Sequence, residues 1–276
     1  CNTFNRSFLA ESQDFTNLDP QQYVEGSYPG VFFRLGRFKD TPAYGMTYSE
    51  PMQGVELSFG KKLKTTIMYG NYAPSTSIES STDTNMNNTL HSVDLYPELC
   101  NQKLFSLELD YPLSKAVNAK VHYQSKPTTS GPVLSDGTKF YEFGVDSMLT
   151  KKLKLITAMV HSNASSQQNG WGAMLQYGQA FPPIRGNYAL YGGYYNVPRN
   201  STIVCGGMHQ TLIGDYFSPI GEVCKGLVFV AQFVPMNDTM ITMYYMHGKT
   251  ASYALAKQLD SGSDKNLFRF QWDFFF

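Results

Sequence analysis

NLFRFQWDFFF, residues 266–276, alternates apolar and polar side chains with a period of two. Successive side chains of an extended strand point to opposite faces, so a strand here would have one apolar face. That face would carry the five aromatic residues Phe268, Phe270, Trp272, Phe274 and Phe276. The other face would carry Arg269, Gln271 and Asp273, with Phe275 as the exception. Because terminal residues usually fray into water, an apolar row here indicates another medium, and we expect hydrocarbon against it.

The same period of two recurs along the chain. It is clearest in GVELSFG (54–60), LFSLELDY (104–111), VNAKVHYQ (117–124), FYEFGVDS (140–147) and GWGAMLQYG (170–178). These segments match the template of a half-buried strand and do not match a 3.6-residue repeat. The sequence therefore predicts an all-β protein.

Composition limits the class of protein further. Only 16% of the 276 residues are charged, and 14% are aromatic. Lys+Arg and Asp+Glu balance at 22 each, so the chain lacks the basic field of a nucleic-acid-binding protein. It contains no run of about 18 apolar residues, as a membrane-spanning helix requires. A spanning strand needs only about 9–11 residues, of which alternate ones are apolar.

Connections between these segments alternate in length. Short, turn-like connections are expected at 60–64, 112–116, 149–154, 181–186 and 235–238. Long polar stretches lie between them, at 72–102, 124–138, 162–169, 196–224 and 248–265. Short turns at one end and long loops at the other are the plan of an outer-membrane β-barrel. Tyr and Trp gather near the strand ends, as in the aromatic girdles of such barrels.

Counting strands backwards from the carboxy-terminus gives the expected architecture. Strands running toward the short turns are expected near 54–60, 103–111, 138–147, 170–178, 225–233 and 266–276. Strands running the other way are expected near 43–49, 63–72, 117–124, 153–161, 186–196 and 239–247. Residues 31–38 and an earlier segment would raise the count to about 14, within a range of 12–16. We predict a transmembrane antiparallel up-and-down β-barrel over residues 31–276, with 1–30 as a first strand or a plug.

Phrases of the carboxy-terminal half resemble a known family. They are KKLKLITAMVHSNASSQQNGWGAMLQYG (151–178), NYALYGGYYNVP (187–198), KGLVFVAQFVPMNDTMITMYYMHGK (225–249) and LFRFQWDFFF (267–276). The pattern is similar to the barrel of diderm porins that carry an S-layer-homology domain. The resemblance covers about half the chain and implies a trimeric general porin of about sixteen strands, tethered to the cell wall. This chain departs from the family in its lower strand count and in having no S-layer-homology domain ahead of the barrel.

Charges of both signs would fall on the inner face of the barrel. Such charges are costly in a dry core but cost little against a water-filled lumen, where they orient polar solutes. The candidate pore-lining residues are Arg34, Glu56, Lys64, Glu108, Asp110, Lys120, Glu142, Asp146, Arg269 and Asp273. A long loop, either 72–102 or 196–224, is expected to narrow the lumen or to cap it. A disulfide between Cys205 and Cys224 would stiffen the second loop.

Two other classes of protein are weighed against a channel. An enzyme would need a nucleophile beside a base, and His122 shares a face with Ser106 and Glu108. The chain has no nucleophile-elbow phrase, HExxH or metal-ligand spacing, so we predict no enzymatic activity, cofactor or metal. A secreted glycoprotein would explain the five Asn-x-Ser/Thr sequons, although Asn237 falls in an expected tight turn. Cys1 is either a lipidated residue or an arbitrary start.

The function predicted from these patterns is passive diffusion of small hydrophilic solutes and ions through the bacterial outer membrane. The alternative is a non-conducting barrel with a structural, cell-wall-tethering or adhesive role. Expected partners are the lipid bilayer, two further copies in a homotrimer and an envelope or cell-wall component, with no nucleic acid. The barrel-assembly machinery is a further expected partner, for which Trp272, Phe274 and Phe276 resemble the carboxy-terminal recognition signal.

Overall fold

The computed structural model describes residues 4–5, 22–40, 42–47, 50–72, 102–127, 137–203, 224–250 and 263–275. These residues form fourteen strands and a short 3-10 helix, η2 (Arg199–Ser201). The strands are β1 (Phe4–Asn5), β2 (Gln22–Tyr28), β3 (Val31–Asp40), β4 (Glu50–Phe59), β5 (Lys64–Tyr72), β6 (Gln102–Pro112), β7 (Val117–Ser125), β8 (Lys139–Met148), β9 (Leu153–Ser162), β10 (Asn169–Gly178), β11 (Tyr188–Val197), β12 (Cys224–Phe233), β13 (Thr239–Thr250) and β14 (Ser263–Phe274).

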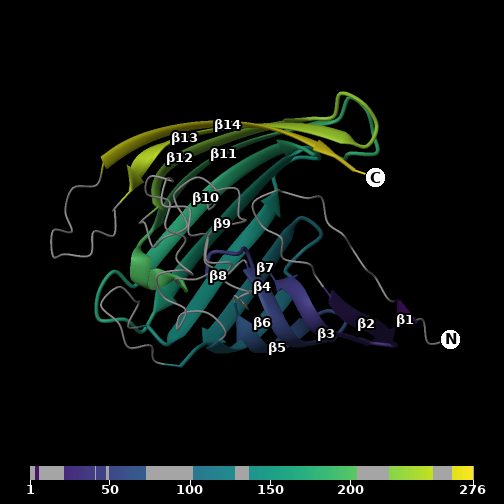
Figure 1. The fold of residues 1–276 in the computed structure, drawn as a ribbon, viewed down its shortest axis with the longest axis vertical. Coiled ribbons are helices and arrows are strands. Elements are labelled where there is room, and N and C mark those ends of the chain that lie inside the picture. Colours follow the sequence, from purple (N-terminus) through teal and green to yellow (C-terminus); the bar gives the residue numbers. More distant parts are fainter. Residues whose placement is uncertain are drawn as a thin grey trace, which may run out of the picture.

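All fourteen strands belong to one sheet in which each strand pairs with the next strand of the chain. Every pair is antiparallel, so the chain runs up and down without a crossover, and the sheet curves around a central space (Figure 1). Within the described residues the sheet stays open between β1 and β14. The predicted all-β, up-and-down barrel fold of about 14 strands is confirmed.

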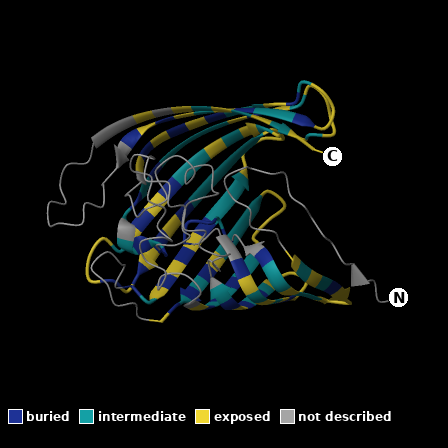
Figure 2. Cartoon of the chain, in the orientation of Figure 1, coloured by how far each residue is buried: buried dark blue, intermediate teal, exposed yellow. Residues whose placement is uncertain are grey.

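The two faces of the sheet differ in character. The inner face carries the buried side chains, and the outer face carries large apolar side chains that are about half exposed (Figure 2). Examples on the outer face are Phe143, Leu190 and Phe270, which are 46%, 48% and 56% exposed. A continuous apolar surface of this extent is typical of contact with lipid, because monomeric soluble proteins rarely expose one. Within the described ranges, no helix is long and apolar enough to cross a bilayer.

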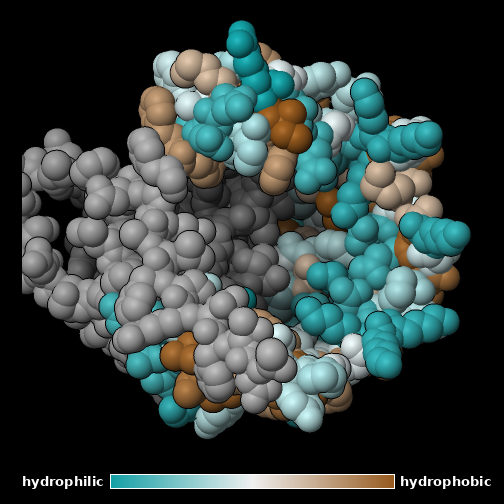
Figure 3. Space-filling view, turned by 90° about the vertical axis from the view of Figure 1, so that its right-hand side faces the viewer, coloured by the Kyte–Doolittle hydropathy of each residue, from teal (hydrophilic) through white to brown (hydrophobic). Residues whose placement is uncertain are grey.

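The turns between the strands explain where the strands end. In two of them a hydroxyl accepts backbone hydrogen bonds from residues further along the chain, as in an ST-turn. The Ser114 hydroxyl accepts from the amides of Ala116 and Val117, and the Thr150 hydroxyl accepts from those of Lys152 and Leu153. At the end of the molecule that carries the short turns, hydrophilic residues form the right-hand part of the rim beside a recessed centre (Figure 3).

Eleven of the twelve strands expected from the backward count are confirmed, and the one expected near 43–49 is wrong. Residues 42–47 form a turn, in which the Gly45 amide donates to the Pro42 carbonyl over 2.8 Å. Alternating Tyr44, Met46 and Tyr48 resemble a strand, but Gly45 has a φ of +73°, which an extended strand does not permit. On the side of β4 where that strand was expected, the neighbour is β3. β2 precedes β3 across a turn at residues 29–30.

Candidate functional site

The ten candidate pore-lining residues all lie on the inner face, as the strand register shows. Five of them come together on β6, β7 and β8, namely Glu108, Asp110, Lys120, Glu142 and Asp146. Lys64 of β5 lies opposite Asp110. The other four lie apart from this group: Arg34 and Glu56 form an ion pair of 3.2 Å, whereas Arg269 and Asp273 lie on β14.

The five gathered residues surround residues 42–47, which we name the inward segment because they fold onto the inner face of the sheet. The segment follows β3 and precedes β4, so both of its ends are fixed at the same end of the barrel. Pro42 cannot donate a backbone hydrogen bond, and Gly45 provides the positive φ that the turn requires. The backbone therefore leaves the sheet at this point and finds its hydrogen-bond partners inside the barrel.

Glu142 on β8 holds the inward segment through its carboxylate. One oxygen accepts from the Tyr44 amide over 2.9 Å. The other oxygen accepts from the amide and the hydroxyl of Thr47, over 3.3 and 3.2 Å. Glu142 is 1% exposed, so these donors provide the hydrogen bonds that water would provide to an exposed carboxylate.

Glu108 and Lys120 hold the start of the same segment. The Glu108 carboxylate accepts from the Ala43 amide, and the Lys120 ammonium donates to the Ala43 carbonyl over 3.3 Å. Lys120 Nζ lies 3.6 Å from Glu108 and 3.9 Å from Asp110. Both backbone groups of Ala43 are thus satisfied by charged side chains of the barrel wall.

His122 completes a chain of buried polar groups. Its Nε2 lies 2.8 Å from the Ser106 hydroxyl, and its Nδ1 lies 3.2 Å from the Thr47 hydroxyl and 4.0 Å from Glu142. Ser106 and His122 are both 0% exposed, so the Ser106 hydroxyl is closed to a substrate. A hydroxyl, an imidazole and a carboxylate do meet here, but the arrangement supports the inward segment rather than an open catalytic site.

Tyr44 extends the inward segment toward the short-turn end of the wall. Its hydroxyl donates to Asp146 over 3.0 Å, and Asp146 also pairs with Lys154 at 3.0 Å. A β-carbon on Gly144 would lie 2.5 Å from the Tyr44 ring, so only glycine leaves room for the ring there. Burial, together with the Asp146 carboxylate, raises the pKa of Tyr44, which keeps the hydroxyl protonated and able to donate.

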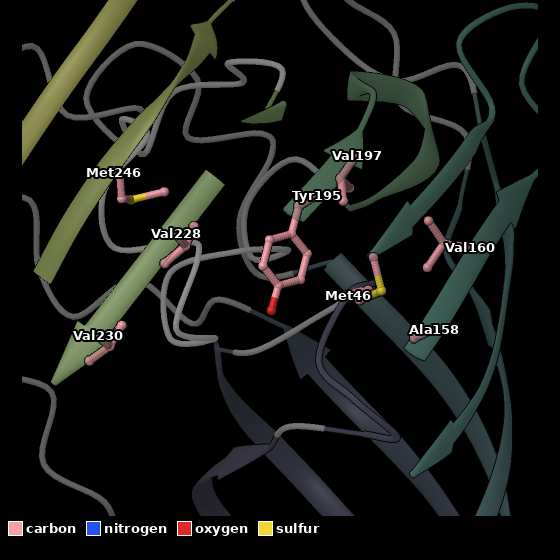
Figure 4. Packing of buried hydrophobic residues seen from close by; sticks show 8 residues of the cluster. All are labelled: Met46, Ala158, Val160, Tyr195, Val197, Val228, Val230 and Met246. Carbon is pink, nitrogen blue, oxygen red and sulfur yellow. The ribbon is translucent and has the colours of Figure 1, made fainter. Parts of the chain in front are cut away.

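Met46 connects the inward segment to the opposite wall. It belongs to a buried cluster with Ala158, Val160, Tyr195, Val197, Val228, Val230 and Met246, which come from β9, β11, β12 and β13 (Figure 4). The Thr47 carbonyl accepts from the Thr202 hydroxyl and the Ile203 amide, over 3.1 and 3.2 Å. The segment thus touches both sides of the interior and narrows the space inside the sheet.

Sequence reasoning placed the narrowing segment elsewhere. The two loops proposed for that role, 72–102 and 196–224, lie mostly outside the described residues. So does Cys205, and the side chain of Cys224 is not described, so the disulfide stays a prediction. Thr47 and Met46 were missed, although the Pro42 and Gly45 spacing was a signal for a turn.

The carboxy-terminal aromatic residues lie where the sequence pattern places them. Trp272 and Phe274 point outward from β14, with 48% and 47% of their surface exposed. Phe276 lies outside the described residues. Among the described side chains, no group of three or more His, Cys, Asp or Glu residues is arranged to hold a metal ion.

Comparison with known proteins identifies the fold. No family model and no curated protein sequence matches the chain. A variant of the Rh. blastica porin is similar in structure over 100% of this chain and 88% of its own, with 10% identity and a TM-score of 0.52. A second variant of that porin covers 96% and 80%, with 9% identity and a TM-score of 0.52. Pseudomonas aeruginosa OpdQ covers 92% and 80%, with 11% identity and a TM-score of 0.51. The chain therefore has a porin-type β-barrel fold.

Proposed function

We propose that this protein is a porin of the bacterial outer membrane, a passive diffusion channel for small hydrophilic solutes and ions. The observation that carries the proposal is the inward segment, which charged side chains of the inner face hold across the interior. Charges of both signs that stay partly exposed on the inner face, such as Arg34, Asp110 and Lys120, suit a water-filled passage, because they cost little against water. The porin-type fold and the apolar outer face support the same function.

The charges around the inward segment favour cations. Four carboxylates, Glu108, Asp110, Glu142 and Asp146, lie around it, against three ammonium groups, Lys64, Lys120 and Lys154. A passage lined by more acidic than basic groups raises the local concentration of cations. The ten inner-face residues predicted from sequence are therefore proposed as pore-lining. The five near the inward segment are proposed to line the narrowest part of the passage.

The expected partners follow from the same proposal. The long connections face outward and the short turns face the periplasm, as in other bacterial barrels. Trp272, Phe274 and Phe276 are proposed as the signal for the barrel-assembly machinery. A homotrimer and a cell-wall tether rest on the resemblance of residues 151–276 to porins that carry an S-layer-homology domain.

Swelling of proteoliposomes in isotonic sugars of increasing size tests the function. The purified protein is expected to admit small sugars and to exclude larger ones, because the inward segment narrows the passage. Liposomes without protein serve as the control. Inserted protein that admits no sugar of any size contradicts the proposal and favours the non-conducting barrel.

A further inference from the structure

The ionisable side chains of the outer face are distributed unevenly. Among strand residues whose side chains are described, every outward acidic or basic group is basic, and no Asp or Glu points outward. All of these groups lie at the end of the barrel that carries the long connections. They are Arg37, Lys103, Lys139, His161, Lys225 and His247.

Three of them lie over the neighbouring strands β6 to β9. Lys103 and Lys139 lie on β6 and β8, two strands apart and two residues out of level, which places them about 12 Å apart at ordinary strand geometry. His161 lies on the neighbouring strand β9, opposite Tyr141. All three side chains are exposed, and Lys103 Nζ also lies 5.8 Å from the Tyr69 ring. We name Lys103, Lys139 and His161 the basic patch.

A ladder of aromatic rings adjoins the basic patch on the same face. Ring centroids are 6.3 Å apart for Phe105 and Tyr123, 5.2 Å for Tyr123 and Tyr141, and 6.4 Å for Tyr141 and His161. Aromatic belts of this kind mark the depth at which a barrel passes from hydrocarbon to headgroups. The basic patch is therefore level with the headgroups rather than with the acyl chains.

The opposite end of the outer face differs. Tyr111, Tyr177, Tyr188 and Phe274 end the strands there, and the described strand residues add no outward basic group. The lysines at that end point inward from a strand, as Lys64 and Lys154 do, or lie in the turns, as Lys151 and Lys152 do. The asymmetry therefore belongs to the lipid-facing surface and not to the general charge of the chain, which is balanced.

We propose that the basic patch binds the phosphate groups of anionic lipids in the leaflet at the long-connection end. The inference rests on the proposed membrane-spanning barrel. Phosphate oxygens complement two ammonium groups and an imidazole, and outward carboxylates that would compete for them are missing from the described strands. Each basic residue near the headgroups raises the association of an anionic lipid about fivefold.

The two tryptophans allow a direct test. Trp171 points outward at the end that carries the basic patch, and Trp272 points outward at the short-turn end. Trp272→Phe leaves Trp171 as the single reporter, and Trp171→Phe leaves Trp272. Each variant is placed in phosphatidylcholine vesicles that contain a minor fraction of phosphatidic acid with brominated acyl chains, which quench tryptophan on contact. Vesicles with brominated phosphatidylcholine at the same fraction give the reference.

Quenching of Trp171 by the phosphatidic acid is expected to exceed the reference, whereas Trp272 shows no excess. Lys103→Gln and Lys139→Gln are each expected to lower the excess association about fivefold. The double variant Lys151→Gln with Lys152→Gln, which removes two positive charges from a turn, is expected to leave the excess unchanged. Equal quenching at both tryptophans, or an excess that survives the patch substitutions, overturns the inference.

Quenching and conductance report on different claims. Quenching requires only that the barrel inserts, so a barrel with lipid excess at Trp171 and no conductance supports the lipid site and contradicts the porin. A conducting barrel without the excess contradicts the lipid site alone. Protein that never inserts overturns both, because the outer face then does not meet lipid.

Discussion

Replacing Glu142 by alanine is expected to release the inward segment while the barrel stays folded. The substitution removes the acceptor of three hydrogen bonds, from the Tyr44 amide and from the amide and hydroxyl of Thr47. Hydrogen bonds to a charged acceptor contribute about 1.5–3 kcal/mol each. Two of the three are long, and water enters the space that the carboxylate leaves, so the sum is an upper bound.

We expect a net loss of about 3 kcal/mol in the free energy that keeps the segment docked. That loss shifts the equilibrium between docked and released segment about a hundredfold. The contacts of Ala43 with Glu108 and Lys120 remain, and so does Met46 in its apolar cluster. The segment should therefore become mobile rather than unfold the wall around it.

Single-channel recording in a planar bilayer measures this change. Glu142→Ala is expected to show a higher mean conductance and more open-channel noise than the unsubstituted protein. Glu25→Ala is the matched control, because it removes the same charge from a carboxylate that pairs with Arg34 and has no bond to the inward segment among the described residues. Heat-modifiable mobility in detergent checks that both variants remain folded. A folded Glu142→Ala channel with unchanged conductance and noise would refute the role given to this carboxylate.

Three further predictions concern the same region. Gly144→Ala places a methyl group against the Tyr44 ring and should alter conductance in recordings, whereas Gly192→Ala, which meets its nearest neighbour at 3.6 Å, should not; equal behaviour would contradict the packing. Lys120→Gln removes one of three cations near four carboxylates, so the reversal potential in a salt gradient should shift toward stronger cation selectivity, and a shift toward anions would contradict the proposed lining. Tyr44→Phe loses the single bond to the Asp146 carboxylate, worth about 1.5–3 kcal/mol, and should raise open-channel noise less than Glu142→Ala, which loses three bonds; noise as large as that of Glu142→Ala would contradict the role of Glu142 as the main anchor.

Strands could be predicted from the sequence because their signal is local. A β-barrel in lipid needs an apolar side chain at every second position, and β10 and β14 show this alternation almost without interruption. Residues 43–49 show that the same signal misleads when it is short. Tyr44 and Met46 alternate with small and polar residues, yet they face the interior because Pro42 and Gly45 turn the chain.

The site could be predicted only in part, since its contacts are distant in sequence. Alternation placed Glu108, Lys120 and Glu142 on the inner face, and the register confirms that they share it. The partner of Glu142 lies 98 residues away at Tyr44, and no pattern within one segment encodes such a contact. The buried His122 was likewise placed on the correct face without its role in supporting Thr47.

The central claim is that lipid covers the outer face of this barrel while water passes through its interior. Recording the purified, unsubstituted protein in a planar bilayer tests that claim most directly. Stepwise increments of current that grow in proportion to the voltage and the salt concentration are the predicted result. Protein that inserts, as shown by its heat-modifiable mobility after recovery from the membrane, but gives no stepwise current would contradict it.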